Sequence, residues 1–139
     1  MLTLITLYSV LTMTACPKGT TLHKVTVAEH SFQTAVKALQ DADIAEFNNG
    51  FISADTHLTI ERSIEKIAMA GKDLDSTLAT ANVTNASIKV KLDAIYTLLD
   101  DLNNNGFLGV KNPTAKASLE IALDTIKTII DNALVQVTP

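Results

Sequence analysis

The chain has 139 residues and a formal net charge of −4, which is enough sequence for one domain with an ordinary hydrophobic core. Arg62 is the only arginine and no basic cluster occurs, so the sequence lacks the basic stripe that nucleic-acid binding requires. Aromatic residues make up 4% of the chain and tryptophan is absent, which leaves few platforms on which bases or sugars could stack.

Residues 1–15 form an apolar segment without a charged side chain. The segment ends in Met13, Thr14 and Ala15, and the residue that follows, Cys16, is the only cysteine of the chain. The segment is shorter than the ~20 apolar residues that a membrane-spanning helix needs. A single cysteine cannot form a disulfide within one chain, so Cys16 calls for a different explanation.

The run Met13-Thr14-Ala15-Cys16 resembles the end of a bacterial lipoprotein signal peptide, in which an apolar residue, a small residue and Ala or Gly precede a cysteine. It departs from that family at Met13, where Leu is usual, and no Lys or Arg precedes Lys18, whereas secretory signals open with positive charge. The resemblance implies that residues 1–15 are removed and that Cys16 is lipidated. It also implies that the protein is anchored outside the cytoplasm, to a membrane of the bacterial cell envelope.

Two alternatives for the first segment stay open. Its polar residues fall close to one helical face, so residues 1–15 could be retained as a helix that packs on the rest of the chain or on a partner. The segment could also remain in the membrane as a spanning helix. In each case residues 16–21 form a short tether, because proline and glycine interrupt a helix.

From residue 22 onward, apolar residues recur at spacings of three and four, which is typical of helices with one buried face. The pattern predicts four helices, over residues 22–48, 54–81, 85–103 and 113–137. The predicted caps are Ser53 or Asp55 for the second helix, Thr84 or Asn85 for the third, and Asn112 followed by Pro113 for the fourth. Gly50 is expected to end the first helix in the left-handed conformation.

The apolar stripes identify the expected core. They consist of Val25, Ala28, Phe32, Ala35, Leu39 and Ala42; Ile60, Ile64, Ile67, Gly71, Leu74, Leu78 and Ala81; Ile88, Leu92, Ile95, Leu99 and Leu102; and Ala115, Leu119, Ala122, Ile126, Ile129, Ala133 and Val137. Val36, Leu98, Leu123, Ile130 and Leu134 widen these stripes. Gly71 on the second stripe is expected to let a neighbouring helix approach closely, at a cost of ~1 kcal/mol in helix propensity. Glu29, Glu61 and Glu65 are expected on solvated faces.

Four amphipathic helices with short connections pack most simply as an antiparallel up-down-up-down bundle. We therefore expect an all-α fold in which residues 22–139 form one bundle domain, monomeric because its apolar seam is complete within one chain. Asn48-Asn49-Gly50-Phe51-Ile52 is similar to Asn104-Asn105-Gly106-Phe107-Leu108. Either the two helical hairpins are related by duplication, or two amphipathic hairpins are alike by chance.

Asp101, Asn103, Asn105 and Gly106 stand at the spacing with which an EF-hand calcium loop opens, so the segment resembles that family. The resemblance implies oxygen ligands at Asp101, Asn103 and Asn105. It fails at position 12, where Asn112 replaces the bidentate carboxylate, so any Ca²⁺ binding would be weak. The alternative is a polar helix connection with Gly106 at the C-cap and Asn112 as the next N-cap.

Nothing in the sequence indicates catalysis. His23, His30 and His57 are expected to be solvated or to cap helices, because local spacing assembles no set of three or four zinc ligands. The carboxylate pairs, Glu61/Glu65, Asp73/Asp75 and Asp100/Asp101, stand beside lysines or near helix ends, as solvated faces do. No phosphate-binding glycine loop and no nucleophile elbow occurs.

We therefore expect a small envelope-anchored lipoprotein with a binding, scaffolding or structural role, without a cofactor or an enzymatic activity. Its membrane contact is made through lipidated Cys16, and its protein partner is not identified by the sequence. One alternative is a self-associating or filament-forming helical protein that retains residues 1–15. A second alternative is a bundle that binds Ca²⁺ weakly or takes a small ligand.

Overall fold

A computed structural model describes residues 19–139, and the segment 1–15 with its lipidation residue Cys16 lies outside the described part. The described part contains four α-helices, one short 3₁₀ helix and no strand, which confirms the all-helical prediction. The elements are α2 (Thr21–Asn48), α3 (Ala54–Leu78), α4 (Asn85–Asn104), η1 (Gly106–Gly109) and α5 (Pro113–Val137).

The helices begin where the sequence places capping residues. Ser53 and Thr84 each accept a hydrogen bond from a backbone N–H of the following first turn, and Thr84 forms a reciprocal capping box with Ser87. The side chain of Asn112 accepts from two backbone N–H groups, and Pro113 follows it at the first helical position. These side chains satisfy amide groups that have no partner within the helix.

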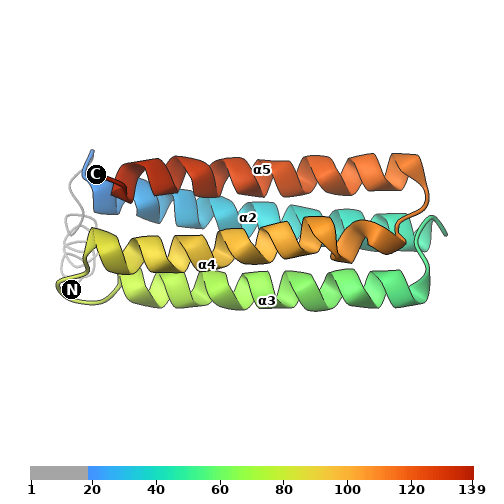
Figure 1. The fold of residues 1–139 in the computed structure, drawn as a ribbon, viewed down its shortest axis with the longest axis horizontal. Coiled ribbons are helices and arrows are strands. Elements are labelled where there is room, and N and C mark those ends of the chain that lie inside the picture. Colours follow the sequence, from blue (N-terminus) through green and yellow to red (C-terminus); the bar gives the residue numbers. More distant parts are fainter. Residues whose placement is uncertain (1–18) are drawn as a thin grey trace, which may run out of the picture.

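The four helices lie side by side in a bundle, with α2 and α4 each packed against α3 and α5 (Figure 1). Along each helix the colours of Figure 1 show that α2 and α4 run in one direction and α3 and α5 in the other. The connection from α2 to α3 and the 3₁₀ helix η1 lie at one end of the bundle. The start of α2, the connection from α3 to α4 and the C-terminus lie at the other end.

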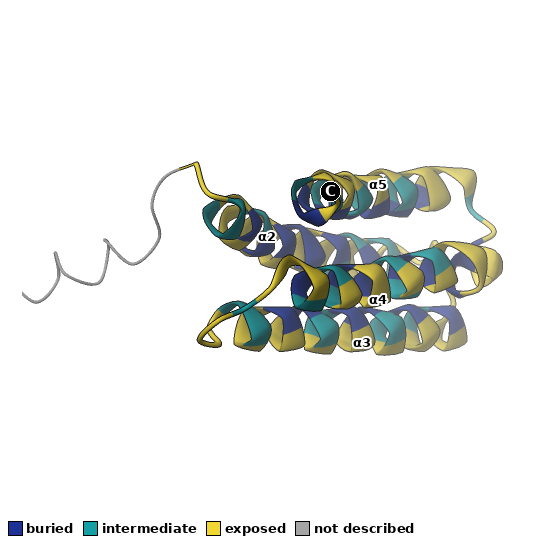
Figure 2. Ribbon diagram, turned by 60° about the vertical axis from the view of Figure 1, so that its left-hand side comes forward, coloured by how far each residue is buried: buried dark blue, intermediate teal, exposed yellow. Residues whose placement is uncertain are grey.

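The core follows one seam along each helix, and Figure 2 shows these buried strips facing inward. In α3 and α4 the observed seams match the predicted stripes, apart from the last two positions of α3. In α2 the buried positions are instead Val25, Glu29, Phe32, Ala35, Val36, Leu39 and Asp43. The prediction of a solvated Glu29 was wrong: only 4% of this residue is exposed, and Gln33 donates a hydrogen bond to its Oε1.

The helix α3 ends three residues earlier than predicted, at Leu78 rather than at residue 81. Ala79 is the C-cap, Thr80 N–H donates to Thr77 O in the turn that follows, and Asn82 has a left-handed φ of 61°. Ala81 lies beyond the helix and is exposed, while Leu78 packs at the margin of the core.

The two similar loops fold differently. Gly50 has φ of +75°, and the N–H groups of Gly50 and Phe51 donate to Phe47 O and Glu46 O, which is a Schellman motif. Gly106 instead enters η1 without a positive φ, so its predicted role as a C-cap was wrong and Asn105 holds that position. Phe51 is exposed, whereas its counterpart Phe107 is 1% exposed and closes the end of the core.

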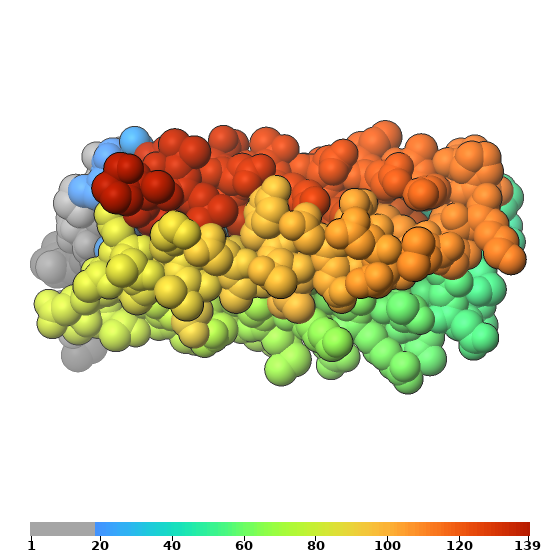
Figure 3. All heavy atoms as spheres, viewed as in Figure 1, coloured from blue at the N-terminus to red at the C-terminus, as the bar shows by residue number. Residues whose placement is uncertain are grey.

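None of the helices between residues 19 and 139 is long and apolar enough to span a membrane. The segment expected to be a tether, residues 16–21, is described only from Gly19 onward, and α2 already begins at Thr21. Figure 3 shows the side chains of α4 and α5 meeting along the length of the bundle on the face in view.

Candidate functional site

The described chain buries one pair of titratable side chains between two helices. Asp43 of α2 is fully buried, and its Oδ2 lies 2.6 Å from Nδ1 of His57 on α3. When Asp43 is ionised it can only accept, and the ring N–H of His57 is then the donor. The expectation that His57 is solvated or caps a helix was therefore wrong.

Glu61 extends this pair into a cluster of three. It lies one turn after His57 on α3, and the candidate ligand atoms of Asp43, His57 and Glu61 all lie within 4.8 Å of one another. Gln40 of α2 donates from Nε2 to Oε2 of Glu61 over 3.1 Å. Glu61 was predicted on a solvated face and lies instead at the interface of α2 and α3.

Two oxygens of the cluster lack hydrogen-bond partners. Oδ1 of Asp43 and Oε1 of Glu61 are both buried, and neither is paired. Among residues 19–139, neither carboxylate forms an ion pair with a lysine or an arginine. An unpaired buried acceptor costs ~1–3 kcal/mol, so this arrangement calls for a specific explanation.

The ring of His57 is held in place by an aromatic neighbour. Phe47 stacks on it with a centroid distance of 4.2 Å and an angle of 5° between the ring planes. Phe47 and Asp43 are one turn apart on α2, so one face of this helix supplies both the stacking partner and the hydrogen-bond acceptor. The imidazole therefore has a fixed plane and a fixed direction for Nδ1.

The environment changes the protonation of Asp43. Burial raises the pKa of Asp43 from its ordinary value of 3.8 to about 6. The charge and hydrogen bond of His57 lower this pKa, and Glu61 raises it through its charge and through a hydrogen bond between the two carboxyl groups when one of them is protonated. Two carboxyl groups thus lie close together beside His57, and no lysine or arginine among residues 19–139 forms an ion pair with them.

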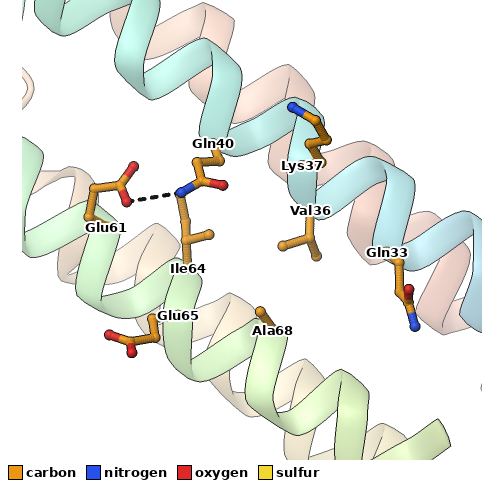
Figure 4. A pocket seen from close by; sticks show the side chains of 8 residues that line it. All are labelled: Gln33, Val36, Lys37, Gln40, Glu61, Ile64, Glu65 and Ala68. Atoms are coloured by element: carbon orange, nitrogen blue, oxygen red, sulfur yellow. Dashed lines mark hydrogen bonds between the residues drawn. The ribbon is translucent and has the colours of Figure 1, made fainter.

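A surface groove of about 510 Å³ between α2 and α3 opens beside the cluster (Figure 4). In Figure 4, Gln40 and Glu61 meet across its upper end, joined by their hydrogen bond, while Val36, Ile64 and Ala68 form its apolar part. Glu61 therefore belongs both to the groove and to the buried cluster. Lys37 and Glu65 line the same groove.

The residues predicted for calcium do not form a loop. Asp101 and Asn103 lie within α4, and Asn105 is its C-cap. Nδ2 of Asn105 donates to Oδ1 of Asp101 over 2.6 Å, so these two side chains meet. Asn103 stands two residues from each, about 200° around a helix, so the helix does not bring it to them.

The other predicted groups lie apart from the cluster. His23 and His30 are on α2 near the opposite end of the bundle, where both border a shallow depression of about 310 Å³. Asp73 pairs with Lys91 over 2.6 Å, and Asp100 pairs with Lys127 over 2.5 Å, both in partly exposed positions. These carboxylates serve inter-helix ion pairs, which is consistent with the solvated faces expected for them.

The spacing pattern of α2 points to part of the cluster. The buried seam passes through residues 25, 29, 32, 36, 39 and 43, which are spaced alternately by four and three residues. Asp43 therefore stands at a core position in the sequence itself. His57 and Glu61 each directly follow a seam residue of α3, at the edge of its buried face.

No protein-family model matches the chain, and neither a curated protein nor a solved structure matches it significantly. The chemistry of the chain therefore has to be argued from its own residues. One nitrogen and two carboxylate oxygens on facing helices are ligands suited to a divalent cation, and Gln40 and Phe47 orient two of the three side chains.

Proposed function

We propose that this protein is a lipoprotein of the bacterial cell envelope, anchored at Cys16, whose antiparallel helical bundle has a binding, scaffolding or structural role and no catalytic activity. The observation that carries the proposal is the run Met13-Thr14-Ala15-Cys16 after an uncharged apolar segment. A lipoprotein cysteine bears more than one acyl chain, and stable anchoring needs about two such membrane signals.

The short tether and the length of α2 support display of the bundle at a membrane surface. Five peptide steps separate Cys16 from Thr21, so an anchored Cys16 keeps the start of α2 within about 17 Å of the membrane surface. The 28 residues of α2 rise about 42 Å from that point. Phe51 and Leu108 are exposed at the end of the bundle opposite the start of α2.

The core supports a monomeric bundle. Each of the four helices contributes a buried apolar seam, and Ile52, Phe107 and Val110 complete it within one chain. The exposed large apolar side chains are distributed over different elements: Val27, Ile44, Phe51, Leu58, Met69, Val90, Leu108, Ile121 and Val135. Single exposed apolar residues are normal on a monomer surface.

Replacement of Cys16 tests the anchor. We expect Cys16→Ser to leave the chain at full length, with residues 1–15 attached and without the added mass of acyl chains. Thr14→Ser keeps a small residue two positions before the cysteine, so this control should still be processed and retained in the membrane. An unchanged mass of the Cys16→Ser protein would contradict the proposal.

The alternative of a self-associating protein that retains residues 1–15 predicts different results. The chain would then keep Met1 in the cell, and light scattering would show an assembly that disappears when residues 1–15 are removed. A monomer with a modified N-terminal cysteine supports the anchored bundle instead.

A further inference from the structure

The cluster of Asp43, His57 and Glu61 has no part in the proposed anchoring, and it lies toward the end of α2 that is remote from Thr21. Asp43 is 22 residues beyond the start of α2, about 33 Å along the helix. We propose that Asp43, His57 and Glu61 form a binding site for a divalent transition-metal ion of the zinc class.

The donor set favours this class of ion. Zn²⁺ takes imidazole nitrogen at ~2.0–2.1 Å and carboxylate oxygen at ~2.0–2.2 Å. Ca²⁺ and Mg²⁺ prefer oxygen ligands alone, so a site that includes the His57 ring discriminates against them. Three protein ligands leave a fourth tetrahedral position for water or a small anion.

The geometry is close to what such an ion requires. Ligand atoms around a tetrahedral zinc ion are about 3.4 Å apart, given the bond lengths above. In the protein, Nδ1 of His57 and Oδ2 of Asp43 are 2.6 Å apart, and the three candidate ligand atoms lie within 4.8 Å of one another. The separations of the three atoms would have to change by up to about 1.4 Å to reach this spacing.

The unpaired oxygens give the strongest independent support. Asp43 is fully buried, and its Oδ1 has no hydrogen-bond partner; the same holds for Oε1 of Glu61. Two carboxylates and a neutral imidazole carry a charge of −2 in ionised form, which one divalent cation neutralises. Metal binding at Nδ1 requires the neutral His57 ring to carry its one proton on Nε2, and it gives the unsatisfied carboxylate oxygens a cation as partner.

The neighbouring side chains preorganise the three ligands. Gln40 holds Glu61 by a hydrogen bond to Oε2, which leaves Oε1 free for the ion. Phe47 fixes the plane of the His57 ring by stacking. Such partners commonly change metal affinity by ~10–100-fold when they are removed.

Calorimetric titration with ZnCl₂ tests the site directly. The full chain is used with Cys16→Ser, which removes the thiol as a competing ligand, after treatment with a chelator. We expect one Zn²⁺ per chain with a dissociation constant in the micromolar range or below. We also expect no saturable heat with CaCl₂ at the same concentrations, which separates this site from the residues at the end of α4.

Three isosteric variants and two controls assign the ligands. Asp43→Asn and Glu61→Gln should each weaken Zn²⁺ binding at least tenfold while the far-ultraviolet circular dichroism stays unchanged, and His57→Gln should do the same. Glu65→Gln is the matched control, because Glu65 lines the same groove one turn further along α3. His30→Gln removes an exposed histidine of α2 and should likewise leave the affinity unchanged.

Nitrogen-15 NMR of the three histidine rings provides a readout that does not depend on variant folding. Stoichiometric Zn²⁺ should shift the ring nitrogens of His57 alone, with His23 and His30 as internal references. The proposal is overturned if His23 and His30 respond first, if all three respond only at millimolar metal, or if Glu65→Gln weakens binding as much as Glu61→Gln does.

Discussion

Gly71 is the position at which the packing of α2 against α3 can be tested most sharply. It lies on the buried seam of α3, and a Cβ atom built there would overlap Cε1 of the Phe32 ring and lie 3.2 Å from its Cδ1. Phe32 is 1% exposed, so its ring cannot simply swing into solvent. Replacing Gly71 by alanine therefore has two opposite effects on stability: helix propensity improves and packing against Phe32 worsens.

The two effects have comparable magnitudes. Alanine is favoured over glycine by ~1 kcal/mol inside a helix. Overpacking a well-filled core costs about 1–3 kcal/mol. A depression of about 220 Å³ beside Phe32 gives the ring limited room to shift. We expect Gly71→Ala to be neutral or to lower the free energy of unfolding by up to about 2 kcal/mol.

Met69 supplies the matched reference, because it lies two residues away on the same helix and is 62% exposed. The difference between Met69→Ala and Met69→Gly measures helix propensity alone. Urea unfolding followed by circular dichroism gives the four free energies. The preference for alanine over glycine should be about 1–3 kcal/mol smaller at residue 71 than at residue 69. In a Phe32→Leu background, much of the preference for alanine at residue 71 should return.

An equal preference for alanine at residues 69 and 71 would refute this reasoning. It would show that the helices do not approach as closely at Gly71 as the ring contact indicates. An unchanged preference in the Phe32→Leu background would contradict the assignment of the cost to this ring.

Two further predictions concern a buried charge and a helix cap. In the metal-free protein, the pKa of Asp43 is raised in the fold, so the folded state binds more protons than the unfolded state between pH 4 and 6. The free energy of unfolding of the wild type, minus that of Asp43→Asn, should therefore fall as the pH rises through about 6. His57 and Glu61 are the facing titratable groups, and urea unfolding at each pH measures both free energies. A value that stays constant or increases with pH would contradict the prediction. Thr84→Ala disrupts the capping box with Ser87 and should lower the free energy of unfolding, measured with urea, by about 1 kcal/mol, whereas Thr84→Ser should lower it little. Equal losses of stability in both variants would argue against the cap.

The helices were predictable because their signals are local. Spacings of three and four placed the seams of α3 and α4, and Ser53, Thr84 and Asn112 marked helix starts within one residue. The end of α3 was missed because residue 81 continues the apolar spacing. The helix ends at Leu78 and the chain turns from Ala79 onward, which apolar spacing does not register.

The cluster was missed because charge and burial were treated as exclusive. Glu29 and Asp43 occupy seam positions of α2, yet each was assigned to the surface or left out on account of its charge. Their burial depends on partners: Gln33 within the same helix for Glu29, and His57 on the facing helix for Asp43. The second partner depends on the relative register of α2 and α3, which periodicity within one helix does not determine.

The similar loops show the same limit. Gly50 and Gly106 follow the same pair of asparagines, but only Gly50 takes the left-handed conformation. A Cβ at Gly106 would overlap the Leu102 side chain, so here glycine serves close packing and not a helix stop. Local sequence therefore predicted a turn at both places and the geometry of only one.

The mass of the N-terminal peptide of the mature protein shows whether the protein is anchored through lipidated Cys16. Protein purified from the membranes of its native cells, without an added tag at the N-terminus, is digested and its first peptide is analysed by mass spectrometry. The account predicts a peptide that begins at Cys16 and carries the added mass of acyl chains. A peptide that begins at Met1 with unmodified Cys16 would contradict the proposed anchor.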